Sequence, residues 1–170
     1  DLYTAQAFIT TDLDDNQITA FHPGAMMRSF EKHVKDVPDV GFGIVGPDSY
    51  EAMLQNCQEF SDAGIPFIFD PGQAMPLYNG DELRRMIDQA TYVTVNDYES
   101  LLMSDKTGLS TEEITRRVKA YIITRGDKGS EIHTAEGTLN IPAANAIRVV
   151  DPTGCGDAYR AGLLYGLLND

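Results

Sequence analysis

The chain has 170 residues, of which 42% are hydrophobic and 23% are charged, and its formal net charge is -13 at pH 7. Nucleic acids and anionic membranes require a basic face, so neither is expected as a partner of so acidic a chain. The length suffices for a domain that buries about 70% of its unfolded surface. The two cysteines, Cys57 and Cys155, lie in unrelated settings, which indicates no disulfide framework and fits a reducing cytoplasm. The chain begins at Asp1 rather than Met, in a strand-like pattern, as expected for a fragment.

The first elements in chain order form a predicted β-hairpin, with strands over 7–12 and 17–21 and a polar turn between them. From residue 40 onward the pattern alternates between strand and helix. The predicted strands are 40–45, 65–69, 92–95 and 121–124, and the predicted helices are 49–62, about 83–90, a stretch from about 97, and 111–118. This alternation predicts a mostly parallel sheet with helices on its faces, a three-layer α/β/α fold. A second hairpin is expected over 130–134 and 138–141.

The last strand, expected to end at Val150, leads into Asp151-Pro-Thr-Gly-Cys-Gly-Asp157 and then a helix toward Leu168. Because Gly154 and Gly156 have no Cβ, the amides of residues 154–157 can point outward at the positive end of the helix dipole. That geometry predicts an anion site. Asp157 is unusual there, because its carboxylate would repel a bound phosphate. Its presence needs a chemical reason.

Polar loops follow the carboxyl end of each predicted strand, which is the edge where open parallel sheets bind ligands. These loops are 46–48, 70–72, 96–97, 124–126 and 151–157. In the fourth, Thr124, Arg125, Gly126 and Gly129 offer a hydroxyl, a charge and close backbone approach to a polyphosphate, although a plain hairpin entry would look similar. In the third, Asn96 and Glu99 have a spacing that suits a hydrated Mg²⁺ or a helix capping box, and the residues alone favour the capping box.

Three motifs in this order resemble the ribokinase-like (PfkB) family of carbohydrate and nucleoside kinases. The segment 151–157 is similar to that family's Asp-Thr-x-Gly-Ala-Gly-Asp signature, Asn96 with Glu99 to its Asn-x-x-Glu motif, and 124–129 to its nucleotide-binding turn. Within the family, residues 8–26 and 68–75 look most similar to bacterial proteins described as adenosine kinases. The whole chain, 1–170, is then a partial ribokinase-like kinase domain, truncated at both ends.

The resemblance implies transfer of the γ-phosphoryl group of ATP to a primary hydroxyl of a nucleoside, with adenosine favoured, or of a sugar. It makes Asp157 the base and the amides of Gly154, Cys155 and Gly156 the anion hole. Asn96 and Glu99 would hold Mg²⁺ through water, and Thr124, Arg125, Gly126 and Gly129 would border the nucleotide. Asp151 and Thr153 match positions that help to hold a monovalent cation such as K⁺ in the family.

The resemblance also indicates what this sequence does not contain. Family members are nearly twice as long, and the sugar-binding motifs and the adenine-pocket loop would lie outside residues 1–170. A lid strand that mediates homodimers in some relatives would lie there too. Little or no activity is therefore expected of residues 1–170 alone.

Two other functions remain as alternatives. Cys155 at a helix N-terminus could be the nucleophile of a phosphatase, but such enzymes place Arg six residues after the cysteine, and Arg160 is five after it. The other alternative is a non-catalytic regulatory module that binds a nucleotide or a sugar. Retention of Asp157 with both glycines counts against it.

Overall fold

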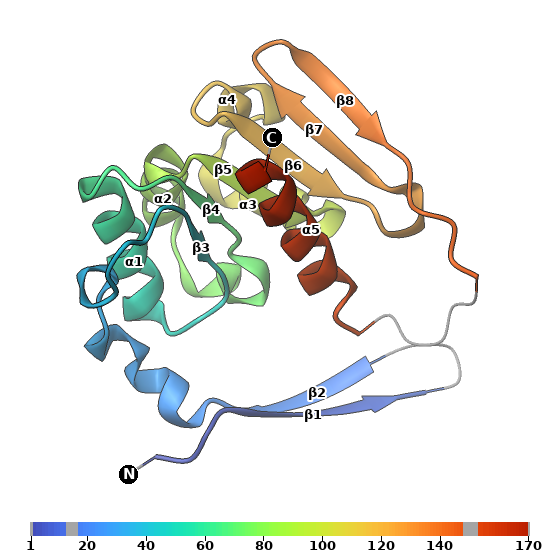
Figure 1. The fold of residues 1–170 in the computed structure, drawn as a ribbon. Helices are drawn as coiled ribbons and strands as arrows, with labels where there is room; N and C mark the ends of the chain where they lie inside the picture. Colours follow the sequence, from blue (N-terminus) through green and yellow to red (C-terminus); the bar gives the residue numbers. More distant parts are fainter. Residues whose placement is uncertain (1, 13–16, 148–152, 170) are drawn as a thin grey trace.

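The computed structural model describes residues 2–12, 17–147 and 153–169. Its main body is a six-stranded sheet in which four neighbouring strands are parallel and the last two are antiparallel (Figure 1). The parallel strands are β3 (Gly43–Val45), β4 (Phe67–Phe69), β5 (Tyr92–Asn96) and β6 (Ala120–Thr124), and the hairpin is β7 (Ser130–Thr134) and β8 (Gly137–Ile141). The mostly parallel sheet predicted from the sequence is confirmed.

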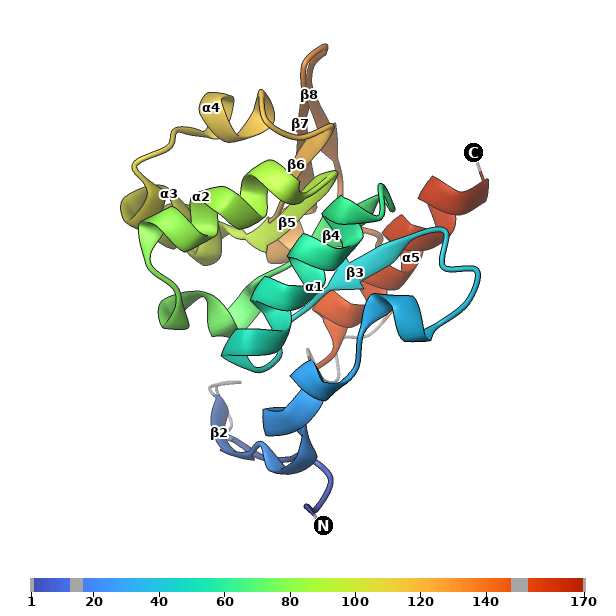
Figure 2. The ribbon, with the colours of Figure 1, turned by 90° about the vertical axis from the view of Figure 1, so that its left-hand side faces the viewer.

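The strands lie side by side in the order in which they occur in the chain. Because crossovers between parallel strands are right-handed, this order puts the connecting helices on one face of the sheet. They are α1 (Tyr50–Asp62), α2 (Gly80–Gln89) and α3 (Asp97–Thr107), with the short α4 (Thr111–Thr115) after them. The last helix, α5 (Cys155–Asn169), lies against the opposite face, which gives the expected three layers (Figure 2).

The helices on the first face begin at side chains that satisfy free backbone amides. Ser49 accepts a hydrogen bond from the amide of Ala52 at the start of α1. Capping boxes, in which the first and fourth residues exchange hydrogen bonds, begin α2, α3 and α4 at Asn79, Asn96 and Ser110. Each such cap contributes about 1 kcal/mol, so the local sequence fixes where these helices start.

The hydrophobic core lies between the sheet and α1, α2 and α3. Successive strand side chains point to opposite faces, and the core takes alternate residues: Phe67 and Phe69 of β4, Val93 and Val95 of β5, and Tyr121 and Ile123 of β6. Ile68, Thr94 and Ile122 are also buried but lie outside this core cluster, on the face toward α5. A polar side chain, Thr94, thus lies in the middle of that second face.

Helix α5 is attached differently from the others, since none of its described residues is fully buried. The sequence suggested that Ala158, Ala161 and Leu164 form its inner face, but the two alanines are exposed. Tyr159, Arg160, Leu163, Leu164 and Leu167 are the larger side chains that are half-buried. The inner face is therefore partly polar.

The remaining segments differ from the expected pattern only in detail. β3 and β4 are shorter than predicted at their amino ends, and 3-10 helices occur at η1 (Gly24–Glu31), η2 (Val34–Asp36), η3 (Gly72–Leu77) and η4 (Gly126–Lys128). The strand predicted to end at Val150 falls largely on residues 148–152, outside the described residues. Among the described helices, none is long and apolar enough to cross a membrane.

The predicted first hairpin is confirmed as β1 (Gln6–Thr11) and β2 (Gln17–His22), which pair antiparallel in a sheet of their own. Figure 1 shows this hairpin apart from the six-stranded sheet. Phe8, Ile18 and Phe21 on it are more than half exposed. It contributes no residue to the core cluster.

Candidate functional site

The loops at the carboxyl ends of the parallel strands meet the start of α5, as the sequence predicted. A small polar cavity of about 80 Å³ opens there. It is lined by Asp70, Thr94, Val95, Asn96, Glu99, Thr124, Gly156, Tyr159 and Arg160. The cavity thus joins the loops after β4, β5 and β6 to the helix that carries the glycine signature.

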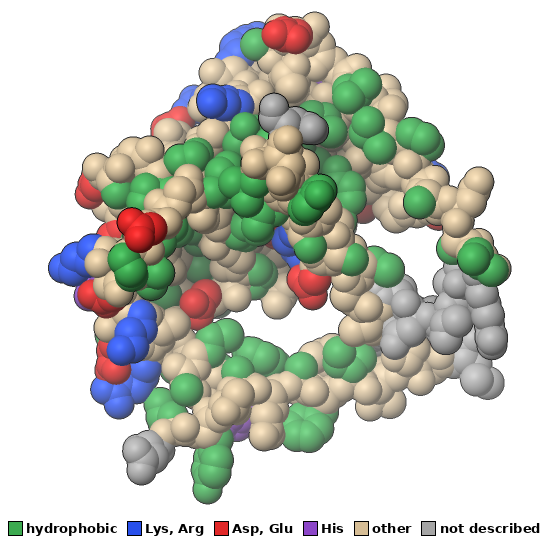
Figure 3. Space-filling model, in the orientation of Figure 1, with side chains coloured by type: hydrophobic (Ala, Val, Ile, Leu, Met, Phe, Trp, Pro, Cys, Tyr) green, Lys and Arg blue, Asp and Glu red, His purple; other side chains and the backbone are tan. Residues whose placement is uncertain are grey.

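A second, larger hollow of about 410 Å³ adjoins it on the other side of α5's first turn. Its lining comes from the loops after β3 and β4 and from the start of α5: Pro47, Gln73, Gly154, Gly156, Asp157 and Arg160. Gly156 and Arg160 border both hollows. In Figure 3, basic and acidic side chains meet beside the first turns of α5.

The start of α5 has the open geometry expected of an anion site. Gly154 has a φ of 80°, in the left-handed region, and nothing lies within 4 Å of the position that a Cβ would occupy. Gly154, Cys155 and Gly156 are exposed. The Asp157 side chain is 85% exposed and borders the larger hollow. A helix N-terminus with small residues leaves its amides accessible to an anion.

Asp157 is paired with a residue that the sequence analysis did not place in the site. Arg160, one turn further along α5, donates from Nη1 to Asp157 Oδ1 over 2.9 Å and from Nε to Asp70 Oδ2. Asp70 is only 2% exposed, and its Oδ2 also accepts a hydrogen bond from Thr94 Oγ1 over 2.5 Å. The hydrogen bond with Asp70 raises the pKa of Arg160, so the guanidinium stays charged.

Residues Asn96 and Glu99 form the capping box of α3, which was one of the two interpretations of their spacing. Asn96 Oδ1 accepts from the amide of Glu99 over 2.7 Å, and Glu99 Oε2 accepts from the amide of Asn96 over 2.8 Å. Burial raises the pKa of Glu99, and the neighbouring charge of Asp70 raises it further, against the lowering effects of the Asn96 amide and Arg160. Glu82 and Glu113 form the same capping hydrogen bonds, but neither of them lines this cavity.

The side-chain oxygens around the small cavity are suitable ligands for a hydrated magnesium ion. Asp70 and Glu99 provide hard carboxylate oxygens, and Asp70 Oδ1 is buried without a hydrogen-bond partner among the described residues. Mg²⁺ prefers one or two carboxylates and keeps several waters. No group of three or more His, Cys, Asp or Glu that could hold a metal occurs in the described part of the chain. An ion here would therefore be completed by water and by phosphate oxygens.

In the predicted nucleotide-binding turn, some residues are accessible to a ligand and others are engaged with the rest of the chain. Thr124 lines the small cavity, and nothing lies within 4 Å of a Cβ position at Gly126. Arg125 pairs with Glu131. At Gly129, with φ 85°, a Cβ would lie 1.9 Å from the carbonyl oxygen of Ile141, so this glycine is required by the chain's own backbone.

The remaining predicted site residues have simpler outcomes. Asp151 lies outside the described residues, and Thr153 is an exposed turn residue just before α5, so the monovalent-cation site stays a prediction. Cys155 is exposed, but the guanidinium of Arg160 is taken up by two carboxylates, which counts against a phosphatase that needs a free arginine for its substrate. Sequence reasoning missed Thr94, Asp70 as a partner, and Arg160. The polar threonine inside an apolar strand and the aspartate directly after a strand were the available signals.

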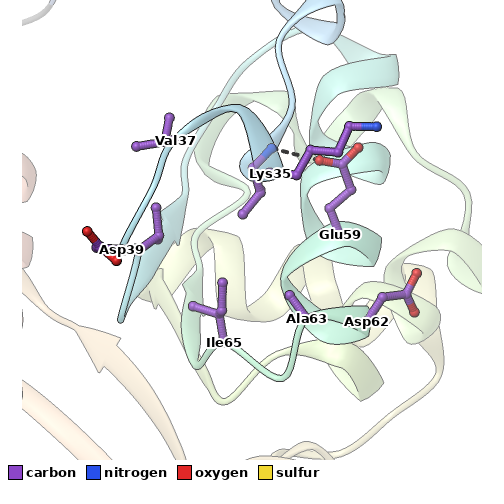
Figure 4. Close-up of a pocket in the computed structure, with 9 residues that line it drawn as sticks. Lys35, Val37, Asp39, Glu59, Asp62, Ala63 and Ile65 are labelled. Carbon is purple, nitrogen blue, oxygen red and sulfur yellow. Dashed lines mark hydrogen bonds between the residues drawn. The ribbon is translucent and has the colours of Figure 1, made fainter.

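Another hollow on the described surface lies away from this site and has different chemistry. It has a volume of about 550 Å³ and is lined by residues that precede β3 and β4, at the amino-terminal edge of the sheet (Figure 4). Figure 4 shows Glu59 turned toward the segment of Lys35, where Glu59 Oε2 accepts from the amide of Val34 over 2.7 Å. Its carboxylates are those of Asp39, Glu59 and Asp62, and among the described residues they belong to no group of three or more His, Cys, Asp or Glu that could hold a metal ion.

Comparison with known proteins agrees with the three motifs. Residues 2–170 match the model of the pfkB family carbohydrate kinases. The chain belongs to this kinase family. It is 35% identical over 165 residues to the nucleoside kinase of Methanocaldococcus jannaschii. The aligned residues cover 95% of the chain and 53% of that relative. It is also 35% identical over 170 residues to the ribokinase of Lactococcus lactis, covering 96% of the chain and 54% of that relative.

Solved structures of family members have the same fold. The nucleoside kinase of Burkholderia thailandensis in complex with inosine superposes with a TM-score of 0.95 at 59% identity, over 98% of this chain and 55% of that one. The nucleoside kinase of M. jannaschii superposes with a TM-score of 0.89 at 32% identity, over 98% and 55% of the two chains. The chain thus spans about half the length of the relatives it matches, and its fold is the ribokinase-like α/β fold.

Proposed function

We propose that the intact protein is a nucleoside kinase that transfers the γ-phosphoryl group of ATP to a primary hydroxyl of its substrate. Membership of the pfkB family supports the reaction class. The nucleoside class is supported by the 59% identity to a nucleoside kinase whose structure contains inosine, and by the nucleoside kinase among the 35% relatives. Adenosine and inosine are the first acceptors to test, with a sugar hydroxyl as the alternative suggested by the ribokinase relative.

The observation that carries the proposal is the juxtaposition of two hollows across the first turn of α5. One hollow is lined by the carboxylates Asp70 and Glu99 and by Thr124, which suits a metal and phosphates. The other contains the Asp157 carboxylate and suits the acceptor. Gly156, whose amide belongs to the proposed anion hole, borders both hollows, so a group passing from one to the other would be bound at the start of α5.

In this proposal the acceptor hydroxyl lies against Asp157 and gives its proton to the Asp157 carboxylate. The hydroxyl oxygen forms the new bond to the γ-phosphorus, and the bond between that phosphorus and the bridging oxygen of ADP breaks. A weak base suffices, because a loose phosphoryl-transfer transition state calls for proton acceptance late in the reaction. Positioning and charge stabilisation then dominate, and each well-aimed donor contributes about 3 kcal/mol.

The residues of the chain have distinct parts in this reaction. The amides of Gly154, Cys155 and Gly156 bind the transferring group, and the dipole of α5 favours its negative charge. Asn96, Glu99 and Asp70 would hold Mg²⁺ through water, and the ion, when bound, neutralises charge on the phosphate oxygens. Thr124 and Gly126 border the nucleotide, and Asp151 with Thr153 would hold the monovalent cation.

The proposal is tested with the intact protein, ATP and Mg²⁺, by measuring ADP release with a panel of nucleosides and sugars. We expect turnover with at least one purine nucleoside, with the phosphate on its primary hydroxyl. Asp157→Asn should lower kcat about 1000-fold, because it removes the base. Cys155→Ala should retain activity within a few-fold, because Cys155 contributes only its amide.

Two results would contradict this function. Loss of activity in Cys155→Ala with retention in Asp157→Asn would indicate cysteine chemistry instead. Absence of turnover with every acceptor, together with tight nucleotide or nucleoside binding, would favour a regulatory module.

A further inference from the structure

Arg160 lies at the centre of the site and makes two contacts of different character. Its Nε bonds to Asp70, which is 2% exposed, and its Nη1 bonds to Asp157, which is 85% exposed. One end of the guanidinium is therefore fixed inside the protein, and the other reaches a carboxylate in the larger hollow. The partners are far apart in the chain, since 90 residues separate Arg160 from Asp70.

The buried end of this arrangement is rigid. Asp70 directly follows β4 and is also bonded by Thr94 of β5, so two neighbouring strands fix its carboxylate. Without Arg160 the buried Asp70 carboxylate would have no cation beside it, which is unfavourable, so the ion pair keeps the guanidinium at this position. Because Arg160 presents its donors in a planar fork, fixing Nε also fixes the direction of Nη1.

The bond to Asp157 has no comparable structural purpose. An exposed ion pair between residues three apart on a helix contributes little to stability, because water and salt screen it. Asp157 is at the helix N-terminus, where its charge is favourable without any partner. Its contact with Arg160 does, however, select one orientation for a carboxylate that is otherwise free to rotate in solvent.

We propose that Arg160, anchored by Asp70 and Thr94, is a positioning residue that holds the Asp157 carboxylate toward the acceptor hollow. The inference rests on the function proposed above, in which Asp157 accepts the hydroxyl proton. Arg160 also borders both hollows, so the residue that orients the base lies beside the path proposed for the phosphoryl group. In this arrangement the sheet, through Asp70, sets the geometry of a base that belongs to α5.

The test is a double-mutant cycle in the intact protein with Arg160→Met, Asp157→Asn and both together. Misplacing a catalytic group by about 1 Å costs about 100-fold, so Arg160→Met should lower kcat about 100-fold with KM for the nucleoside changed less than threefold. Because Arg160 acts through Asp157, the double variant should be no slower than Asp157→Asn alone. A double variant slower than Asp157→Asn by a further factor of 10 or more would overturn the proposal.

A matched control and a conservative variant separate positioning from folding. Arg117→Met removes an arginine that is also paired with an aspartate, Asp88, but on the outer helices, and it should leave kcat unchanged. Arg160→Lys keeps the charge but cannot make both bonds in fixed directions. Compared with Arg160→Met, it should therefore restore the melting temperature more fully than it restores kcat. Equal recovery of both, or a melting temperature that falls in Arg160→Met with kcat unchanged, would indicate a purely structural ion pair.

A second readout does not depend on turnover. A crystal structure of intact Arg160→Met should show the Asp157 side chain in a changed or multiple orientation while α5 keeps its place. An unchanged Asp157 orientation would overturn the positioning role even in a protein with no kinase activity. Absence of wild-type turnover with a reoriented Asp157 would instead overturn the proposed function and leave the positioning role intact.

Discussion

The two faces of the central sheet are built in different ways. On the face toward α1, α2 and α3, side chains such as Phe67, Val93 and Met86 form a hydrophobic core, in which the hydroxyls of Tyr78 and Tyr121 are the polar side-chain oxygens. On the face toward α5, the contacts include hydrogen bonds from Arg160 to Asp70 and from Tyr159 to Ser130, and no residue of the helix is buried among those described. The first face supplies stability, and the second supplies chemistry that needs polar groups near solvent.

The largest effect is expected from removing a buried side chain on the first face, toward α1, α2 and α3. Phe67 is fully buried and stacks on Phe60 at a centroid distance of 5.4 Å. Phe67→Ala should lower the free energy of unfolding by about 4 kcal/mol, because it removes buried area and leaves a cavity. The exposed Leu101 is the control, and Leu101→Ala should change it by less than about 0.5 kcal/mol. Urea unfolding measures both, and kcat per folded molecule should stay the same if the faces are separable.

A second experiment compares two glycines that share the same backbone conformation. Gly154 (φ 80°) and Gly108 (φ 69°) both have nothing within 4 Å of a Cβ position, but Gly108 ends α3 and Gly154 precedes α5. Alanine at either position should cost about 1–2 kcal/mol of stability, because it is strained at positive φ. Only Gly154→Ala should also lower kcat, by about 100-fold, because it displaces amides of the anion hole. Equal loss of activity at both positions would mean that the effect comes from stability alone.

A third experiment concerns the pH dependence at Glu99. Its raised pKa means that the folded state binds a proton more tightly than the unfolded state. The contribution of Glu99 to stability is therefore present at low pH and is lost as pH rises from about 4.5 through the folded pKa. Glu99→Gln keeps an acceptor for the Asn96 amide and removes this penalty, so its stability relative to wild type should increase with pH.

The gain should be below about 1 kcal/mol, because Glu99 is only half-buried and solvent screens its charge. The measurement is urea unfolding at pH 4.5 and pH 7 without nucleotide or magnesium. Glu113→Gln, in the capping box of α4, is the matched control and should show no such trend. If instead the wild type became more stable than Glu99→Gln as the pH rises, the charged carboxylate would be shown to stabilise the fold. In the same variant, kcat should fall if Glu99 holds Mg²⁺ through water, as in the proposed function.

The smallest effect is expected at the two cysteines, of which one belongs to a helix on the first face of the sheet and the other to α5 on the second. Burial raises the pKa of the Cys57 thiol to about 12, and its side chain is fully buried in α1, whereas Cys155 is exposed at the start of α5. Iodoacetamide at pH 8 should therefore modify Cys155 alone in the native protein, as measured by mass spectrometry of the two peptides, and nucleotide should slow the reaction. Rapid modification of Cys57 before unfolding would show that the core face opens.

Much of the fold followed from local patterns. The helix predicted over 49–62 and the capping-box interpretation of Asn96 depend on neighbouring residues, and the structure confirms them. Shorter strands at β3 and β4 were not predictable, because pairing with neighbouring strands decides where a strand ends. On the inner face of α5, the prediction holds for Leu164 but not for Ala158 and Ala161, since alanine spacing cannot indicate that an arginine and a tyrosine reach the sheet.

By itself, the sequence determined the alternation of elements, the glycine turn before Asp157 and the motifs of the kinase family, because each depends on residues close together in the chain. The tertiary structure alone decided that Gly129 is required by the Ile141 carbonyl rather than by a ligand, and that Glu99 shares a cavity with Asp70. It also decided that Asp157 is tied through Arg160 to a buried aspartate. These relationships join residues distant in sequence, and only the packing of α5 against the ends of β4 and β5 brings them together.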